Sequence, residues 1–187
     1  MCVIIYKPIG VSLPSQELLQ AAAQTNPDGC GMVSTNCTYK GLSPNRLIKA
    51  VQKCSEMEPI LIHFRLATQG SIRRKNCHPF YDAETKTFFM HNGIMLAPDY
   101  KDMTDSEWVF RKIFVPCIKK HGLHSQKMKE VIRWWANGSR LAFMQNGNVA
   151  TFGDFDSFYG LKLSNKRFLY HNWGVQRCFF NTSRKGY

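Results

Sequence analysis

Short apolar runs that end directly in polar clusters constrain this 187-residue chain more than any other feature. Residues 60–64 and 87–90 have the length and the β-branched or aromatic content of buried strands, and the opening run, residues 2–6, has the same character. Functional residues gather where rigid elements pass into loops. The sequence therefore predicts a sheet with a functional site at its strand ends.

The remaining segments predict helices and hairpins around that sheet. Cap residues and helical patterns predict helices over 15–24, from Ser43 to about residue 54, from the Thr104 capping box to about Pro116, and over 125–136. Further strands are predicted over 141–145, 149–153, 167–171 and 177–181. The chain has no repeat, linker or dinucleotide-binding motif, so this order of elements predicts a single α+β domain over residues 1–187.

The composition excludes several classes of protein. A hydrophobic content of 44% with 13% aromatic residues is globular, and no apolar stretch approaches the roughly 18 residues of a membrane-spanning helix. The N-terminus shows no secretory signal and the seven cysteines form no C-x-x-C pair, so we expect a cytoplasmic protein with reduced thiols. No close spacing of Cys and His predicts a zinc site, and we expect neither a metal nor a cofactor.

The formal net charge is +12, and most of it lies after residue 95. Such an excess favours polyanionic partners. Residues 127–133 are rich in Lys and Arg and precede Trp134-Trp135, a combination found on nucleic-acid-binding surfaces. It equally fits a solvated helix face whose tryptophans lie partly in the core. If nucleic acid binds at all, we expect it on the basic C-terminal half.

Cys2 is the first candidate for chemistry. A small residue after the initiator methionine normally permits removal of Met1, which leaves cysteine as the first residue. A free α-amino group titrates near ~8 and a thiol near ~8.5, so an N-terminal cysteine holds a nucleophile and its general base in one residue. Cysteine at position 2 also occurs by chance, so this residue alone leaves the role open.

Three polar segments carry groups that suit an amino acid as substrate. Arg65 and Thr68 can hold a carboxylate, although Arg65 fits a structural salt bridge equally well. The Asn92 side-chain amide and the Gly93 backbone N–H supply the two donors of an oxyanion hole, although Asn-Gly is also a common turn. Asp105 can bind an ammonium group or interact with the start of a helix.

These segments occur in an order that resembles one enzyme family. The set consists of Met1-Cys2, Asn26-Pro27-Asp28-Gly29-Cys30-Gly31, His63-Phe64-Arg65-Leu66-Ala67-Thr68-Gln69-Gly70, Asn76-Cys77-His78-Pro79-Phe80, His91-Asn92-Gly93 and Thr104-Asp105-Ser106-Glu107. Together they resemble the class II glutamine amidotransferases, whose N-terminal-nucleophile glutaminase domain hydrolyses glutamine. The motifs cover residues 1–107, and the rest of the chain matches only in its general run of strands.

The resemblance implies a four-layer αββα N-terminal-nucleophile hydrolase sandwich. In such an enzyme Cys2, exposed by loss of Met1, would attack the glutamine side-chain amide while its own α-amino group moves the proton. A γ-glutamyl thioester and ammonia would follow. Asn92, through its side chain, and Gly93, through its backbone, would stabilise the oxyanion.

The resemblance also implies how glutamine is bound. Arg65 and Thr68 would hold the α-carboxylate, Asp105 would hold the α-ammonium group, and His78 would help to shape the pocket. These roles agree with the chemistry of the individual residues, which suits an amino acid bound at both ends with its amide delivered to a thiol.

The chain departs from the family pattern at three positions. Val3 stands where the family usually has glycine, Gln69 where histidine is common, and Leu66 where sugar-amidating members carry tryptophan. The chain therefore looks more like the small standalone members found in bacteria and bacteriophages. Its length predicts that the acceptor of the ammonia is a synthetase or modifying enzyme on another chain.

Two other functions stay open at this point. One is a catalytically silent protein with the amidotransferase fold that acts as a basic nucleic-acid- or protein-binding module. The other is an amidohydrolase of the same superfamily that acts on a different amide. Retention of Cys2, Arg65, Asn92 and Asp105 together argues against the first, and Arg65 with Asp105 favours a free amino acid over the second.

Overall fold

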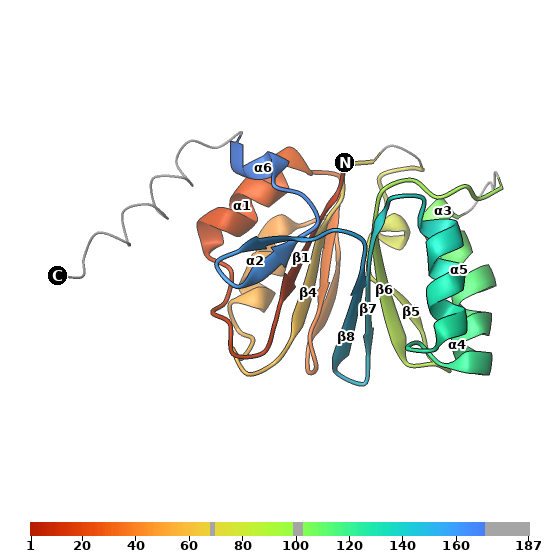
Figure 1. Cartoon of the computed structure of the whole chain (residues 1–187). Helices are drawn as coiled ribbons and strands as arrows, with labels where there is room; N and C mark the ends of the chain where they lie inside the picture. Colours follow the sequence, from red (N-terminus) through yellow and green to blue (C-terminus); the bar gives the residue numbers. More distant parts are fainter. Residues whose placement is uncertain (68–69, 99–102, 171–187) are drawn as a thin grey trace.

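The computed structural model describes residues 1–67, 70–98 and 103–170, whose strands form two antiparallel sheets (Figure 1). Within these residues one sheet has six strands in the order β3-β2-β4-β1-β10-β9, and the other has four in the order β5-β6-β7-β8. The strands are β1 (Val3–Lys7), β2 (Cys30–Val33), β3 (Thr38–Gly41), β4 (Ile60–Phe64), β5 (Phe80–Asp82), β6 (Thr87–Asn92), β7 (Arg140–Gln145), β8 (Asn148–Phe152), β9 (Asp156–Phe158) and β10 (Leu161–Leu163).

Helices cover one face of each sheet. On the six-stranded sheet lie α1 (Gln16–Thr25), α2 (Pro44–Val51) and α6 (Arg167–Tyr170). On the four-stranded sheet lie α3 (Asp105–Val109), the π-helical segment η2 (Phe110–Phe114), α4 (Val115–His121) and α5 (Gln126–Ala136). A short 3-10 turn, η1 (Arg74–Asn76), precedes β5.

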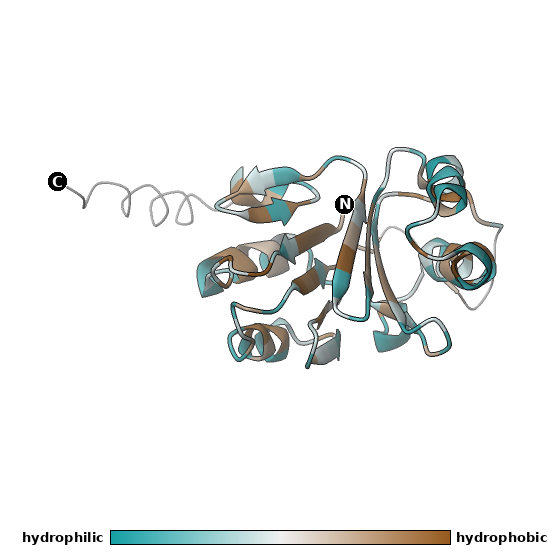
Figure 2. Cartoon of the chain, turned by 60° about the horizontal axis from the view of Figure 1, so that its bottom comes forward, coloured by the Kyte–Doolittle hydropathy of each residue, from teal (hydrophilic) through white to brown (hydrophobic). Residues whose placement is uncertain are grey.

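Three apolar clusters among the described residues hold these layers together. One lies between the six-stranded sheet and its helices, and a second lies between the four-stranded sheet and its helices. The third joins the two sheets, with Ile4 and Leu61 on one side and Met90 and Met144 on the other. Figure 2 shows hydrophobic segments on strands and helices of both halves, and the helices also carry hydrophilic segments.

The strand register places the candidate residues. β1 pairs with β4 from Val3 opposite Phe64 to Lys7 opposite Ile60, so Cys2 lies beside the residues that follow β4. In the other sheet β6 pairs with β7 up to Asn92 opposite Arg140. The ends of β4 and β6, which the sequence marked as places for a site, therefore lie in different sheets.

The predicted helix from Thr104 is correct at its start and wrong at its end. The Thr104 side chain accepts a hydrogen bond from the Glu107 backbone N–H at 3.2 Å, as a capping residue does. The helical path, however, continues through η2 and α4 to His121. Pro116 does not end it, because it lies in the first turn of α4 directly after the widened π turn, where a missing backbone N–H is tolerated.

The strand predicted over residues 167–171 is also wrong. The Asn165 side chain accepts a hydrogen bond from the Arg167 N–H at 3.1 Å, and residues 167–170 form helix α6. Phe168 and Leu169 are buried in the same cluster as α1, so a helical turn suits the apolar pair. The strand predicted over 177–181 lies outside the described residues, and so does His171, the last residue of the strand predicted over 167–171.

The α+β class predicted from the sequence is confirmed by the two antiparallel sheets and their helices. No helix within the described ranges combines the length and the apolar character that crossing a membrane requires. The six cysteines that fall in these ranges are all free thiols.

Phe89 offers a test of the second cluster. Its ring is fully buried, with ring centroids 5.1 Å from Phe110 and 4.9 Å from Phe143. We expect Phe89→Ala to lower the free energy of unfolding by about 3–5 kcal/mol, because it leaves a cavity between sheet and helices. The matched control is Tyr170→Ala, whose ring is 67% exposed, and it should cost less than about 1 kcal/mol. Denaturant unfolding of both variants gives the comparison, and equal losses would contradict this packing.

Candidate active site

The pairing of β1 with β4 brings the Cys2 thiol to the end of β4. Its Sγ donates to the Leu66 carbonyl at 3.5 Å, and the Cys2 carbonyl accepts a hydrogen bond from Asn165 Nδ2 at 2.7 Å. Burial raises the pKa of the Cys2 thiol, although the chain's amino terminus and Arg65 act in the opposite direction. A thiol in this state needs a base to take its proton before it can act as a nucleophile.

A small cavity of about 40 Å³ opens beside this thiol. Its lining comes from both sheets and from the start of α3: Cys2, Arg65, Leu66, Asn76, His78, His91, Gly93, Thr104, Asp105 and Ser106. A volume of this size holds a small number of water molecules. The structure thus brings together Cys2, Arg65, His78, Gly93 and Asp105, which the sequence singled out separately.

Arg65 is almost completely buried and directed at the loop that follows it. Its Nη1 donates to the Ser71 carbonyl at 3.1 Å and its Nη2 to the Gly70 carbonyl at 3.4 Å. Asn76 donates to the same Ser71 carbonyl at 2.9 Å, so η1 and Arg65 hold this segment from two sides. Thr68, the other residue predicted to bind a carboxylate, lies outside the described residues.

Asn92 does not line the cavity, although its neighbour Gly93 does. The Asn92 Nδ2 donates to Ser164 Oγ at 2.8 Å, and Ser164 is itself tied to β1 through the Ile4 N–H at 2.8 Å. An amide nitrogen carries two hydrogens, so a second donor is left on Nδ2. The predicted pair of oxyanion donors is therefore adjacent in the chain, but only the glycine reaches the cavity.

Gly93 is required by its surroundings. It has a φ of 150°, and a Cβ at this position would lie 2.1 Å from Ser139 Oγ. The β6–β7 register causes this close approach, because it places Ser139 directly beside the end of β6.

Asp105 stands at the first turn of α3 and accepts three hydrogen bonds. Its Oδ2 accepts from the Met95 N–H at 2.9 Å, and its Oδ1 accepts from the Ser106 N–H at 2.7 Å and from Ser106 Oγ at 3.1 Å. The carboxylate therefore ties the loop after β6 to α3 and also faces the cavity. Thr104, and not Asp105, provides the side-chain cap of this helix.

Ser106 continues this chain of bonds to His91. The His91 Nδ1 lies 2.7 Å from Ser106 Oγ. Because a carboxylate only accepts, the Ser106 hydroxyl donates to Asp105, and His91 Nδ1 must then carry the proton given to Ser106. The His91 Nε2 is left as a lone-pair acceptor, and burial lowers the pKa of His91 to about 4 against the opposing charge of Asp105. Sequence reasoning assigned no role to His91 or Ser106, although each is the direct neighbour of a residue that it did select.

Two further histidines, His63 and His78, lie between the sheets, and His78 lines the cavity. The His63 Nε2 donates to the His91 carbonyl at 3.1 Å, which joins β4 of one sheet to β6 of the other. The His78 ring lies against the His63 ring with centroids 4.2 Å apart, and neither of its nitrogens has a hydrogen-bond partner among the described residues. Burial lowers the pKa of His63 to about 3 and that of His78 well below its ordinary value, so both rings are neutral. Across the part of the chain that the structure describes, no group of three or more His, Cys, Asp or Glu side chains is arranged to hold a metal ion.

Two comparisons with known proteins bear on the family of this chain. The family model described as "Glutamine amidotransferases class-II" matches residues 41–152, more than half of the chain. One curated relative is the glutamine–fructose-6-phosphate aminotransferase (isomerizing) of Methanococcus maripaludis, which is 31% identical over 83 residues. That match covers 42% of this chain and only 14% of the relative's length.

Gly93→Ala tests the close approach of Gly93 to Ser139. Gly138→Ala is a matched control, because Gly138 also has a positive φ, 75°, but no atom within 4 Å of the position a Cβ would take. We expect about 1 kcal/mol of destabilisation at Gly138 from backbone strain alone, and about 2–4 kcal/mol at Gly93, where the collision adds to the strain. Thermal or denaturant unfolding measures both, and a Gly93 loss no greater than the Gly138 loss would contradict the geometry.

His78→Phe tests the buried neutral histidines. Below pH 6.5 the histidines of the unfolded chain bind protons, whereas His63, His78 and His91 stay unprotonated in the folded state. The free energy of unfolding therefore falls as the pH falls from about 6.5 towards 4. Each such histidine contributes a slope of about 1.4 kcal/mol per pH unit in this window. His78→Phe should therefore make the fall shallower, whereas His121→Phe on the exposed surface should not. Urea unfolding at several pH values measures the slopes, and identical slopes in all three proteins would refute the burial of a neutral His78.

Proposed function

The chain belongs to the class II glutamine amidotransferases, and on this premise we propose that it releases ammonia from glutamine at the cavity beside Cys2. The family predicted from the sequence motifs is thereby confirmed, while the small standalone bacterial or bacteriophage type stays a prediction. The observation that carries the proposal is the meeting of a thiol, a buried guanidinium and a carboxylate, from Cys2, Arg65 and Asp105, around one cavity.

In the proposed reaction, loss of Met1 frees the α-amino group of Cys2. That amino group takes the thiol proton while Sγ attacks the side-chain amide carbon of glutamine. The tetrahedral intermediate then collapses, its C–N bond breaks, and the proton passes to the leaving nitrogen, so that ammonia departs. Water hydrolyses the γ-glutamyl thioester to glutamate and restores the thiol.

Gly93 and Asn92 are the proposed oxyanion donors. The Gly93 backbone lines the cavity, and Asn92 Nδ2 has one hydrogen beyond the bond that it donates to Ser164. A single donor of this kind contributes roughly 2.7–4 kcal/mol to transition-state stabilisation. The clash that any side chain at Gly93 would make with Ser139 supports a backbone role for this position.

Arg65 and Asp105 are proposed to hold the two ends of the amino acid. The Arg65 guanidinium would bind the α-carboxylate with help from Thr68, and the Asp105 carboxylate would bind the α-ammonium group. The cavity volume of about 40 Å³ is small for glutamine, so side chains at its mouth must move when the substrate enters. His78, which lines the cavity, is proposed to shape its wall.

The arrangement of the layers supports the four-layer αββα N-terminal-nucleophile fold as the finer assignment. Each sheet packs against helices on one face and against the other sheet on the opposite face. We propose that residues 1–187 form one domain of this kind. As a glutamine amidotransferase it would work with an acceptor of ammonia, either a domain or an enzyme. Binding of nucleic acid has no support from the family match, and the catalytic groups around one cavity favour an enzyme over a silent binding protein.

Glutamine hydrolysis by the purified protein tests this proposal. Intact mass should show loss of Met1, and glutamate should form from glutamine. Cys2→Ala should reduce the rate by about 1,000-fold or more, because it removes the nucleophile. Cys37→Ala is the matched control, since this half-buried cysteine lies outside the cavity, and it should keep wild-type activity. Two outcomes would refute the proposal. One is glutamate formation that Cys2→Ala does not reduce. The other is wild-type protein that, even with cell extract added, forms no more glutamate than Cys2→Ala does.

A further inference from the structure

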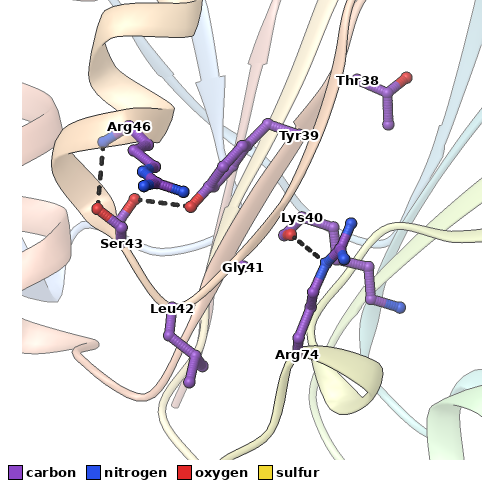
Figure 3. Close-up of a pocket in the computed structure, with 8 residues that line it drawn as sticks. All are labelled: Thr38, Tyr39, Lys40, Gly41, Leu42, Ser43, Arg46 and Arg74. Atoms are coloured by element: carbon purple, nitrogen blue, oxygen red, sulfur yellow. Dashed lines mark hydrogen bonds between the residues drawn. The ribbon is translucent and has the colours of Figure 1, made fainter.

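A second and larger cavity lies away from the candidate active site, at the outer edge of the six-stranded sheet (Figure 3). It has a volume of about 590 Å³, which is in the range of small-molecule sites. The edge strand β3, the loop into α2 and the turn η1 form its walls: Thr38, Tyr39, Lys40, Gly41, Leu42, Ser43, Arg46 and Arg74.

Three cations from three different elements line this cavity. Lys40 comes from β3, Arg46 from the first turn of α2, and Arg74 from η1. Figure 3 shows Arg46 beside Tyr39, and Arg74 beside Lys40. No carboxylate is among the lining residues, and within the described residues none of the three cations takes part in an ion pair. Among the described residues, four other cations pair with acids: Arg111, Lys119, Lys127 and Lys166.

Hydrogen bonds and close packing hold the walls in place. The Arg74 Nε donates to the Lys40 carbonyl at 3.0 Å, and this bond holds the inner end of the guanidinium group in place. The Tyr39 hydroxyl donates to the Ser43 carbonyl at 3.1 Å. Gly41 allows the Tyr39 ring to pack closely here, because a Cβ at position 41 would lie 2.6 Å from the Tyr39 hydroxyl oxygen.

Lys40 is the least exposed of the three cations. Its ammonium group lies 4.5 Å from the centre of the Phe80 ring, and burial lowers its pKa. The charge of Glu107 acts in the opposite direction on this pKa.

We propose that this cavity binds a small molecule that carries a phosphate group. The guanidinium groups of Arg46 and Arg74 supply positive charge and N–H donors for phosphate oxygens, and the Ser43 and Thr38 hydroxyls add neutral donors. An added peptide strand fits less well, because Arg74 already occupies the outward carbonyl of Lys40 on this edge strand. The proposal does not depend on the chemistry at Cys2.

The main alternative occupant is a nucleic acid, because the surface beside the cavity is also basic. Arg46 also lines an adjoining cavity that contains Lys49 and Lys53, so positive charge continues along α2. A nucleic acid would need the basic residues of both cavities, whereas a small phosphate compound needs only Arg46 and Arg74. Glu58 in the adjoining cavity weakens the longer path for a polyanion.

Calorimetric titration of the full chain with inorganic phosphate and inorganic pyrophosphate tests the proposal. We expect saturable one-to-one binding of pyrophosphate with a Kd of about 1 mM or lower, and weaker binding of phosphate. Arg46→Gln should weaken pyrophosphate binding about tenfold, because it removes one charge-assisted contact. The Arg46 side chain makes no hydrogen bond to the described residues, so this variant should fold as the wild type does.

Arg133→Gln is the matched control, because it removes the same charge from an exposed position on α5 and should leave the affinity unchanged. Cys2→Ala should also bind as the wild type does, which separates this site from the glutaminase proposal. Equal losses in Arg46→Gln and Arg133→Gln, or no saturable binding by the wild type, would overturn the proposal. A 20-nucleotide single-stranded DNA that displaces pyrophosphate and loses affinity equally in Lys49→Gln and Arg46→Gln would also overturn it, in favour of a nucleic-acid surface.

Discussion

The antiparallel pairing of β1 with β4 is the constraint on which the site depends. β1 lies inside the six-stranded sheet, between β4 and β10, and its first three residues are fully buried. A slip of one residue would turn each of these side chains to the other face and carry Cys2 away from Leu66. Lys7, fully buried at the far end of the strand, donates to the Glu58 carbonyl at 2.8 Å and to the Glu56 carbonyl. The register is therefore fixed from both ends, and with it the position of the thiol.

The cavity exists only where the two sheets meet. Cys2 and Arg65 come from the six-stranded sheet, whereas His91 and Gly93 come from the four-stranded one. The bond from His63 to the His91 carbonyl crosses this boundary and joins the two halves. Such a junction buries polar groups, and the histidines fit it only in their neutral form. The same packing that assembles the site therefore makes the fold less stable in acid.

Elements with a local signal could be predicted from the sequence. Strand β4 has the predicted bounds, and the helix that begins after Thr104 has the predicted cap. The failures arise from interactions that local patterns do not contain. Pro116 is an ordinary helix terminator unless a π turn precedes it, and residues 167–170 look like a strand until they pack on α1. The short strand β9 (Asp156–Phe158) has too little apolar character to be recognised without its partner β10.

The sequence could identify the chemistry of the site better than its contacts. Asn92 was selected for its amide, but that amide donates to Ser164, a residue 72 positions away that no spacing rule connects to it. The net charge is equally uninformative about contacts, because it sums the charges of the whole chain and does not show which of them share a surface. Most of the excess lies after residue 95, yet Lys40, Arg46 and Arg74 of the first half all line one cavity. Lys119 of α4 and Lys127 of α5 form ion pairs with nearby acids, whereas Arg46 and Arg74 form none with the described residues. Which basic residues share one cavity therefore depends on the fold, and the net charge of the chain does not show it.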